Sequence, residues 1–163
     1  MGKYWKVDIL QLRGGGNYNR LARLNIDGSV DATFNLGSGF NDFVLGLIEL
    51  PNGKLIIGGH FTVFNGVTRN RIVGLNADGT FDASFNTGSG FDGWVRNIKL
   101  QSDGKILVFG GFSNYNGIPI RDIARLNPDG TLDLSFNPGT GFGGNYAELH
   151  GVEIQNDGKI VMT

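Results

Sequence analysis

The sequence of 163 residues contains no cysteine, only 4 prolines and almost no net charge. Without cysteine the chain has neither disulfide bonds nor thiolate metal ligands. The 14 basic and 15 acidic residues leave a formal charge of −1, which excludes the basic surface that contact with a row of phosphates requires. We therefore do not expect nucleic acid as a partner.

Long hydrophobic runs are also missing. No stretch approaches the roughly 20 apolar residues of a membrane span, and Lys3, Lys6 and Asp8 stand where a signal peptide would be apolar. We therefore expect no membrane insertion and no signal peptide in the given chain. Extended helical periodicity is absent as well, so the sequence predicts no long helix.

Glycine is in excess, with 28 residues, together with Asn, Asp, Phe and β-branched residues. These residue types are typical of turns and strands. The apolar content of 40% indicates a folded domain with a core rather than a disordered or linker segment. The composition therefore predicts an all-β protein.

One motif occurs three times, as LNIDGSVDATFN, LNADGTFDASFN and LNPDGTLDLSFN. The copies start at Leu24, Leu75 and Leu126, so that both steps are 51 residues. A Gly-Lys pair recurs once in each step, although three residues are inserted before its last copy. The chain is therefore a single repeat domain, 1–163, with units at 2–52, 53–103 and 104–157 and with 158–163 overlapping the start of a further unit.

Each unit predicts four short antiparallel strands. In FVLGLIELPNGKLIIGGHF, Asn52 and Gly53 separate two apolar runs as a hairpin turn does, and RIVGLNADGTFDASF gives two more strands around Asp78 and Gly79. Four strands in about 51 residues match a β-propeller blade, whereas the coils of a β-solenoid, the alternative, are shorter. LIIGG and ILVFGG are apolar on consecutive residues and indicate inner strands buried on both faces, and their glycine pairs permit close approach or a bulge.

The segments GGHFTVFNG, RIVGLNADGTFDASFN and IKLQSDGKILVFGGF resemble the delta-60 family of bacterial and phage β-propeller repeats, over nearly the whole chain after about residue 17. The resemblance implies a surface, secreted or virion protein without an assigned reaction, and hence a virion, extracellular or cell-surface location. The first unit, with WKVDILQLRGGGNYNRLARLN, lacks the GGxF and FNG landmarks, as the end of a repeat array does.

Three blades are too few for a closed ring, because propellers have about four to eight. The terminal segment YAELHGVEIQNDGKIVMT supplies the strand that the first unit lacks, either within the chain or in a neighbouring chain. Geometry favours the neighbour. We therefore expect self-association, as a dimer of three-blade chains or as neighbours in a larger assembly; a slice of a longer array is the alternative.

The repeated Asn-x-Asp-Gly-x-x-Asp pattern places oxygen atoms around a glycine turn, as calcium loops do. Arg23, Gly74 and Arg125 stand two residues before the Asn, where such loops carry another acidic ligand. The pattern therefore favours Asx turns that cap backbone groups, and we expect no cofactor. The candidate calcium ligands are Asn25, Asp27, Asp31, Asn76, Asp78, Asp82, Asn127, Asp129 and Asp133.

Aromatic residues recur beside a long loop of each unit. With nearby amides and arginines they would form a platform for a sugar, which would make the chain a multivalent lectin that binds a glycan. The alternative is that they fill the core between blades. The candidate ligand-binding residues are Phe61, Phe64, Arg69, Phe112, Tyr115 and Arg121.

No pattern points to catalysis, and we do not expect an enzyme. The only imidazoles, His60 and His150, lie at different phases of the repeat, and there is no GxSxG elbow. An enzyme on a propeller scaffold, the second alternative, would need unique polar residues, for which only the insertion at 143–150 offers a place. The sequence favours a noncatalytic structural or binding module whose partner is a glycan or a surface protein.

Overall fold

The computed structural model describes residues 4–7, 20–139 and 152–162, and of residues 4–7 only the backbone. Within these ranges the chain forms strands and turns. The same ranges contain no helix that is long and apolar enough to cross a membrane. The prediction of an all-β repeat protein is confirmed.

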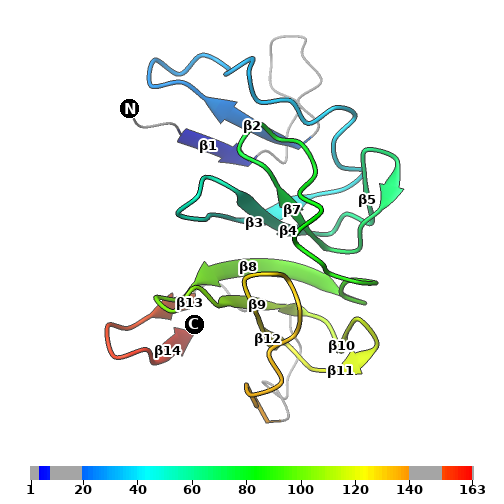
Figure 1. Cartoon of the computed structure of the whole chain (residues 1–163), viewed down its shortest axis with the longest axis vertical. Coiled ribbons are helices and arrows are strands. Elements are labelled where there is room, and N and C mark those ends of the chain that lie inside the picture. The colour runs from blue at the N-terminus through cyan, green and yellow to red at the C-terminus, as the bar shows by residue number, and fades with distance from the viewer. Residues whose placement is uncertain (1–3, 8–19, 140–151, 163) are drawn as a thin grey trace.

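Two equivalent three-stranded antiparallel sheets form the middle of the molecule (Figure 1). We call them the second and third blades. Their strands, in spatial order, are β3 (Val44–Glu49), β4 (Leu55–Gly59) and β7 (Ile72–Leu75), and β8 (Trp94–Leu100), β9 (Ile106–Gly111) and β12 (Ile123–Leu126). The apolar runs predicted as inner strands are β4 and β9, and both lie in the centre of their sheets.

Two partial sheets flank these blades. The first blade contains β1 (Tyr4–Val7) and β2 (Leu21–Leu24), and the fourth contains β13 (Val152–Ile154) and β14 (Ile160–Met162). By the repeat, β1 and β2 correspond to β4 and β7, whereas β13 and β14 correspond to β8 and β9. Each unit boundary drawn from the sequence therefore falls in the turn after the first strand of a blade.

In the first three blades the fourth strand is present only as a single bridge, such as that between Leu75 and Phe81. This strand stops at Asp82, because the Asp82 carboxylate accepts the N–H of Ser84 at 3.0 Å and its carbonyl accepts the N–H of Phe85 at 3.3 Å. The chain turns there and leaves the sheet. The corresponding bridges are Leu24 to Val30 and Leu126 to Leu132.

A small hairpin that the sequence analysis did not predict lies at the rim of the second and third blades. Its strands are β5 (Val63–Phe64) and β6 (Val67–Thr68), and β10 (Asn114–Tyr115) and β11 (Ile118–Pro119). The turns Asn65-Gly66 and Asn116-Gly117 have positive φ at both residues, as a type I′ turn requires. Strands of two residues are too short to show an alternating pattern.

The core is divided among the contacts between consecutive blades, which we call seams. Leu55 and Ile57 of β4 point into the first seam, between the first and second blades, and Ile56 points into the second seam. The strand β9 alternates in the same way between the second seam and the third, which includes Val152 of the fourth blade. Because a central strand serves two seams, both of its faces are apolar.

The first glycine pair, Gly58-Gly59, shows both effects that the sequence predicts. A Cβ at Gly58 would lie 2.4 Å from Val95 of the third blade, so that glycine allows the two blades to approach. The pairing of β3 with β4 shifts register between Val44 and Gly46, opposite this pair. Close approach and a bulge therefore occur together.

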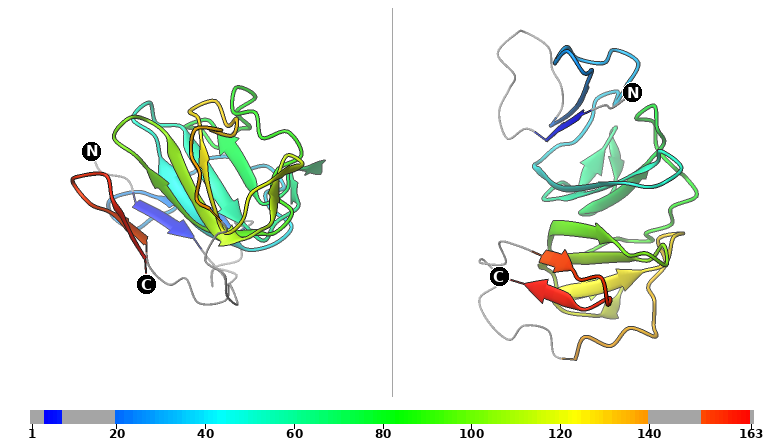
Figure 2. Two further views of the ribbon diagram at one scale, coloured as in Figure 1. Left: turned by 90° about the horizontal axis from the view of Figure 1, so that it is seen from below. Right: turned by 90° about the vertical axis from the view of Figure 1, so that its left-hand side faces the viewer.

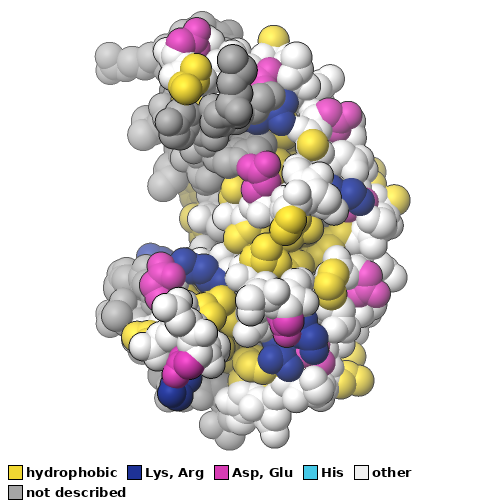
Figure 3. All heavy atoms as spheres, turned by 60° about the vertical axis from the view of Figure 1, so that its left-hand side comes forward, with side chains coloured by type: hydrophobic (Ala, Val, Ile, Leu, Met, Phe, Trp, Pro, Cys, Tyr) yellow, Lys and Arg dark blue, Asp and Glu magenta, His cyan; other side chains and the backbone are white. Residues whose placement is uncertain are grey.

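The blades are stacked in chain order, so that the fourth lies beside β8 of the third (Figure 2). On the face in Figure 3, acidic and basic side chains are interspersed and hydrophobic side chains gather near the middle. This arrangement places the ends of equivalent strands in a row, and side chains at equivalent positions of neighbouring blades come close together.

Candidate functional site

The Asp-Gly loops form Asx turns. The Asp78 carboxylate accepts the hydroxyl of Thr80 at 2.6 Å and its backbone N–H at 3.0 Å. These two hydrogen bonds lower the pKa of Asp78. Asp27 and Asp129 are bonded in the same way to Ser29 and Thr131.

The second carboxylate of each motif is buried and paired with a cation. Asp31, Asp82 and Asp133 are each 6% exposed. Their partners are Arg23, Lys54 and Lys105, at 2.8, 2.9 and 2.6 Å. Hydrogen bonds from Lys105 and then Ser135 hold the pKa of Asp133 well below its usual range.

The candidate calcium ligands are thus engaged in the turns themselves. Asn76, for example, donates its side-chain amide to the hydroxyl of Thr80 at 3.0 Å, as Asn25 and Asn127 do in their own loops. In the described part of the chain, no three His, Asp or Glu side chains are grouped so as to hold a metal ion. Calcium would have to displace these hydrogen bonds in order to bind.

Four of the candidate sugar-binding residues are aromatic, and they lie inside the seams. Phe61, Phe64, Phe112 and Tyr115 are at most 2% exposed. Phe61 and Phe64 pack on Phe40 of the first seam, with ring centroids 4.6 and 4.8 Å apart. Their ring faces are covered by other side chains, so they fill the core between blades, which is the alternative weighed above.

The two candidate arginines do not join these rings. The Arg69 guanidinium lies 4.3 Å from the centroid of Phe81, a partly exposed ring at the rim. Arg121 is exposed in the third blade, but the position equivalent to Arg69 there is Ile120. The structure therefore does not assemble the six predicted residues into one site.

A row of partly exposed rings, which the sequence analysis missed, crosses from the second to the third blade. His60 stacks on Trp94 with centroids 5.7 Å apart and planes inclined by 13°, and Phe43 meets His60 edge-on, with centroids 6.3 Å apart and planes inclined by 77°. Arg20 lies over Phe43 and Arg96 over Trp94, at 5.0 and 6.0 Å. We call Phe43, His60 and Trp94 the aromatic row.

The repeat explains how this row forms. Phe43 directly precedes β3 and Trp94 begins β8, the equivalent first strand, and the two residues are 51 positions apart. The position equivalent to His60 is Gly111, where a Cβ would lie 2.6 Å from the Trp94 indole. Glycine at 111 therefore leaves room for the indole to turn toward His60. Rings with flanking arginines provide a surface for stacking on a flat apolar group.

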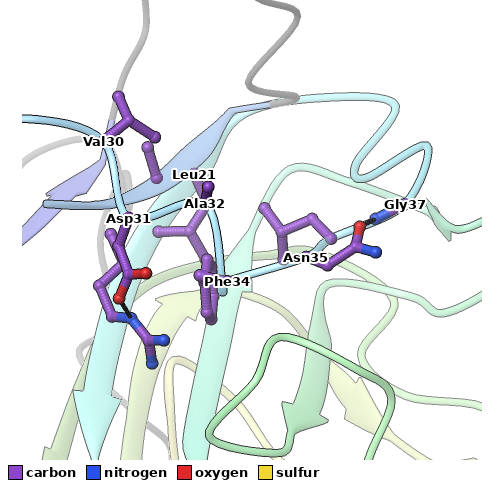
Figure 4. A pocket seen from close by; sticks show the side chains of 10 residues that line it. Leu21, Val30, Asp31, Ala32, Phe34, Asn35 and Gly37 are labelled. Carbon is purple, nitrogen blue, oxygen red and sulfur yellow. Dashed lines mark hydrogen bonds and ion pairs between the residues drawn. The ribbon is translucent and has the colours of Figure 1, made fainter.

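Hollows lined by described residues also lie elsewhere. One of about 380 Å³ is formed by β2 and the loop that follows it, with Arg23, Asp31 and Phe34 in its lining (Figure 4). Arg23 and Asp31 are bonded to each other there, so the charges of this hollow compensate within the protein. Another, of about 210 Å³, lies at the rim between the second and third blades and includes Ile118 and Leu134.

The place proposed for an enzyme lies outside the described residues. This applies to His150 and to the insertion at 143–150. His60, the other imidazole, belongs to the aromatic row, where it stacks on Trp94 and meets Phe43 edge-on.

Comparison with known families agrees with the repeat. A model described as "Domain of unknown function (DUF5122) beta-propeller" matches residues 10–34, 50–85 and 101–136, which is more than half of the chain. Each of the three matches contains one copy of the Asp-Gly motif except its last residue, the asparagine at 35, 86 or 137. No curated protein matches the chain.

Proposed function

We propose that this chain, which belongs to the DUF5122 β-propeller family of unknown function, is a noncatalytic structural and binding module built from delta-60 type repeats. Its place is the surface of a virion or a bacterial cell, as the resemblance of its motifs to surface and virion repeats suggests. A glycan or a surface protein would be its partner.

The observation that carries this proposal is the use made of the repeated polar residues. The N–H of Asn35 donates to the carbonyl of Asp78 in the next blade at 2.8 Å, and Asn86 donates to Asp129 at 2.6 Å. The repeated carboxylates cap turns or pair with cations. The residues that recur therefore stabilise each blade internally, through the carboxylates, and join it to the next blade, through the Asn-to-Asp backbone bonds, which is the task of a scaffold.

Two measurements test the proposal. Immunogold labelling of the particles or cells that produce the chain should place it on their outer surface, and label confined to the interior would contradict the location. Purified chain should not turn over chromogenic glycosides, esters or phosphoesters. Turnover that follows the protein through purification would contradict the noncatalytic assignment.

Carbohydrate binding is a second candidate function, and the aromatic row favours it. Sugars stack on exposed rings, and Phe43 is 37% exposed, whereas the rings first considered are buried. The row also carries arginines at both ends, which donate hydrogen bonds to hydroxyl groups. The row, rather than the seams, is the surface on which a sugar would bind.

A glycan array followed by titration tests this candidate. Trp94→Ala should abolish saturable sugar binding, because the indole forms one end of the stacked rings. Phe81→Ala is the matched control, since it removes another partly exposed ring at the rim and should leave binding unchanged. Absence of binding across the array, or equal binding by the two variants, would exclude the row as a lectin site.

A further inference from the structure

The first and second seams share one set of backbone contacts. In each, the backbone N–H of the asparagine that ends the repeated motif in one blade donates to the backbone carbonyl of the aspartate in the Asp-Gly loop of the next blade. The two pairs are Asn35 with Asp78 and Asn86 with Asp129. The glycine of that loop is buried, and a Cβ at Gly79 would lie 2.9 Å from the carbonyl oxygen of Asn35. The loop therefore packs directly on the backbone of the preceding blade.

A side chain adds a third contact in the first seam. Nη1 of Arg23 donates to the carbonyl of Ala77 at 2.5 Å, one residue before Asp78. In the second blade Gly74 stands where Arg23 stands in the first, and the third blade has arginine again, at Arg125. Arg125 pairs with Asp133 through Nε, as Arg23 pairs with Asp31.

The acceptor loop and the donor groups of this interface each occur once more in the chain. The extra loop lies at one end of the stack of blades and the extra donors at the other, so within one chain they are not in contact. Gly28, the counterpart of Gly79, is exposed, and a Cβ there would meet nothing within 4 Å. At the other end, no described residue accepts the backbone N–H of Asn137 or Nη1 of Arg125. A donor surface at one end thus matches an acceptor loop at the other.

An apolar side chain on the fourth blade also lacks the neighbouring blade that covers its counterparts. Val161 of β14 stands where Ile56 stands in β4 and Leu107 in β9. Those two residues are at most 1% exposed because a following blade covers them, whereas Val161 is 46% exposed. The fourth blade therefore presents a face that is covered by a neighbour at the two equivalent positions.

We propose that a second copy of this chain docks there, with its β2 and its Asp27-Gly28 loop completing the blade that β13 and β14 begin. The Asn137 N–H of one copy donates to the Asp27 carbonyl of the other, and Arg125 donates to the carbonyl of Ile26, as Arg23 does to Ala77. A side chain at position 28 would then meet the backbone of Asn137. The occupant is a second copy because the complementary surface belongs to this chain.

The contact is head-to-tail, so each copy offers one half at each end. Three blades from each of two chains would close a ring of about six, which lies within the usual range for propellers. β1 of one copy and β14 of the other both correspond to the second strand of a blade. Only one of them can therefore occupy that position in the shared blade. The remaining edge strands are then covered rather than exposed.

Light scattering on the purified chain over a range of concentrations tests the proposal. We expect a mass of twice 17.6 kDa at high concentration. Gly28→Asn should weaken this association by about tenfold or more, because its Cβ meets the partner backbone, while asparagine tolerates the positive φ of 84° in the single chain. Circular dichroism checks that the variant folds.

Gly117→Asn is the matched control. Gly117 also has a positive φ, of 77°, and open space around its Cβ, but it lies in a rim hairpin, so its variant should associate like the parent chain. A parent chain that stays monomeric throughout, or a dimer that Gly28→Asn leaves intact, would overturn the proposal. The proposed dimer rests on the scaffold function proposed above and specifies how that scaffold assembles. If the chain is monomeric but immunogold labelling still finds it on the outer surface, the dimer is excluded and the scaffold function is not.

Discussion

Adding a single methyl group at Gly79 tests whether the Asp-Gly loop is part of the seam or only a turn. In Gly79→Ala the new Cβ would lie 2.9 Å from the backbone oxygen of Asn35 and 3.0 Å from its carbonyl carbon. Backbone atoms cannot move aside as the end of a long side chain can. Gly66 of the same blade is the control, because its φ of 75° is also positive but its Cβ would meet nothing within 4 Å.

The two variants share one cost and differ in another. Alanine in the left-handed region costs about 1–2 kcal/mol at either position. Only Gly79→Ala adds a steric clash, which costs about 1–3 kcal/mol, together with weakening of the hydrogen bond from Asn35 to Asp78, which contributes about 1 kcal/mol. We therefore expect Gly79→Ala to be less stable than Gly66→Ala by about 2–4 kcal/mol.

Thermal unfolding followed by circular dichroism measures this difference. At about 2–4 °C for each kcal/mol in a chain of this size, the melting temperature of Gly79→Ala should lie at least about 4 °C below that of Gly66→Ala. Equal melting temperatures would show that the loop does not pack on the preceding blade.

Three further variants or conditions test other contacts. Phe61→Ala empties part of the first seam and should cost about 3–5 kcal/mol in chemical denaturation; a loss below about 1 kcal/mol would place this ring outside the core. Tyr115→Phe removes the hydroxyl that donates to the Gly130 carbonyl at 2.5 Å and should lower the free energy of unfolding by about 1 kcal/mol; an unchanged value would contradict that bond. Hydrogen bonds lower the folded-state pKa values of Asp78 and Asp133, so the stability that these carboxylates contribute is complete above their ordinary pKa of 3.8 and is lost as the pH falls below it. Melting temperatures should therefore stay level above about pH 5 and drop at lower pH. A drop that begins near neutral pH would contradict this expectation.

The blades were predictable because their signals are local and repeated. The apolar runs of β4 and β9 fill consecutive positions, since each strand faces two seams, and a glycine turn follows at a fixed distance. The rim hairpins were missed because strands of two residues carry no periodicity, although the dipeptides Asn65-Gly66 and Asn116-Gly117 are a turn signal that could have indicated them. The fourth strands were overestimated, because the Asx turn at Asp82 ends the pairing after a single bridge.

The candidate sites show where a sequence alone is insufficient. Phe61 and Tyr115 recur beside polar residues, and only the packing of one blade on the next shows that their rings are buried. His60 and Trp94 are 34 residues apart, and their stacking depends on Gly111, in yet another strand. The hydrogen bond from Asn35 to Asp78 across the seam could not be predicted either, because the motif indicates only a local turn and gives no sign of a contact with the next blade.

The most direct test of the seams is amide hydrogen exchange at Asn35 and Asn86, followed by NMR. Both residues are exposed as a whole, so surface position alone predicts fast exchange of their N–H groups. We expect instead that these two amides are protected nearly as well as those of β4 and β9, because each donates across a seam. Exchange at the rate of open loop amides would contradict it.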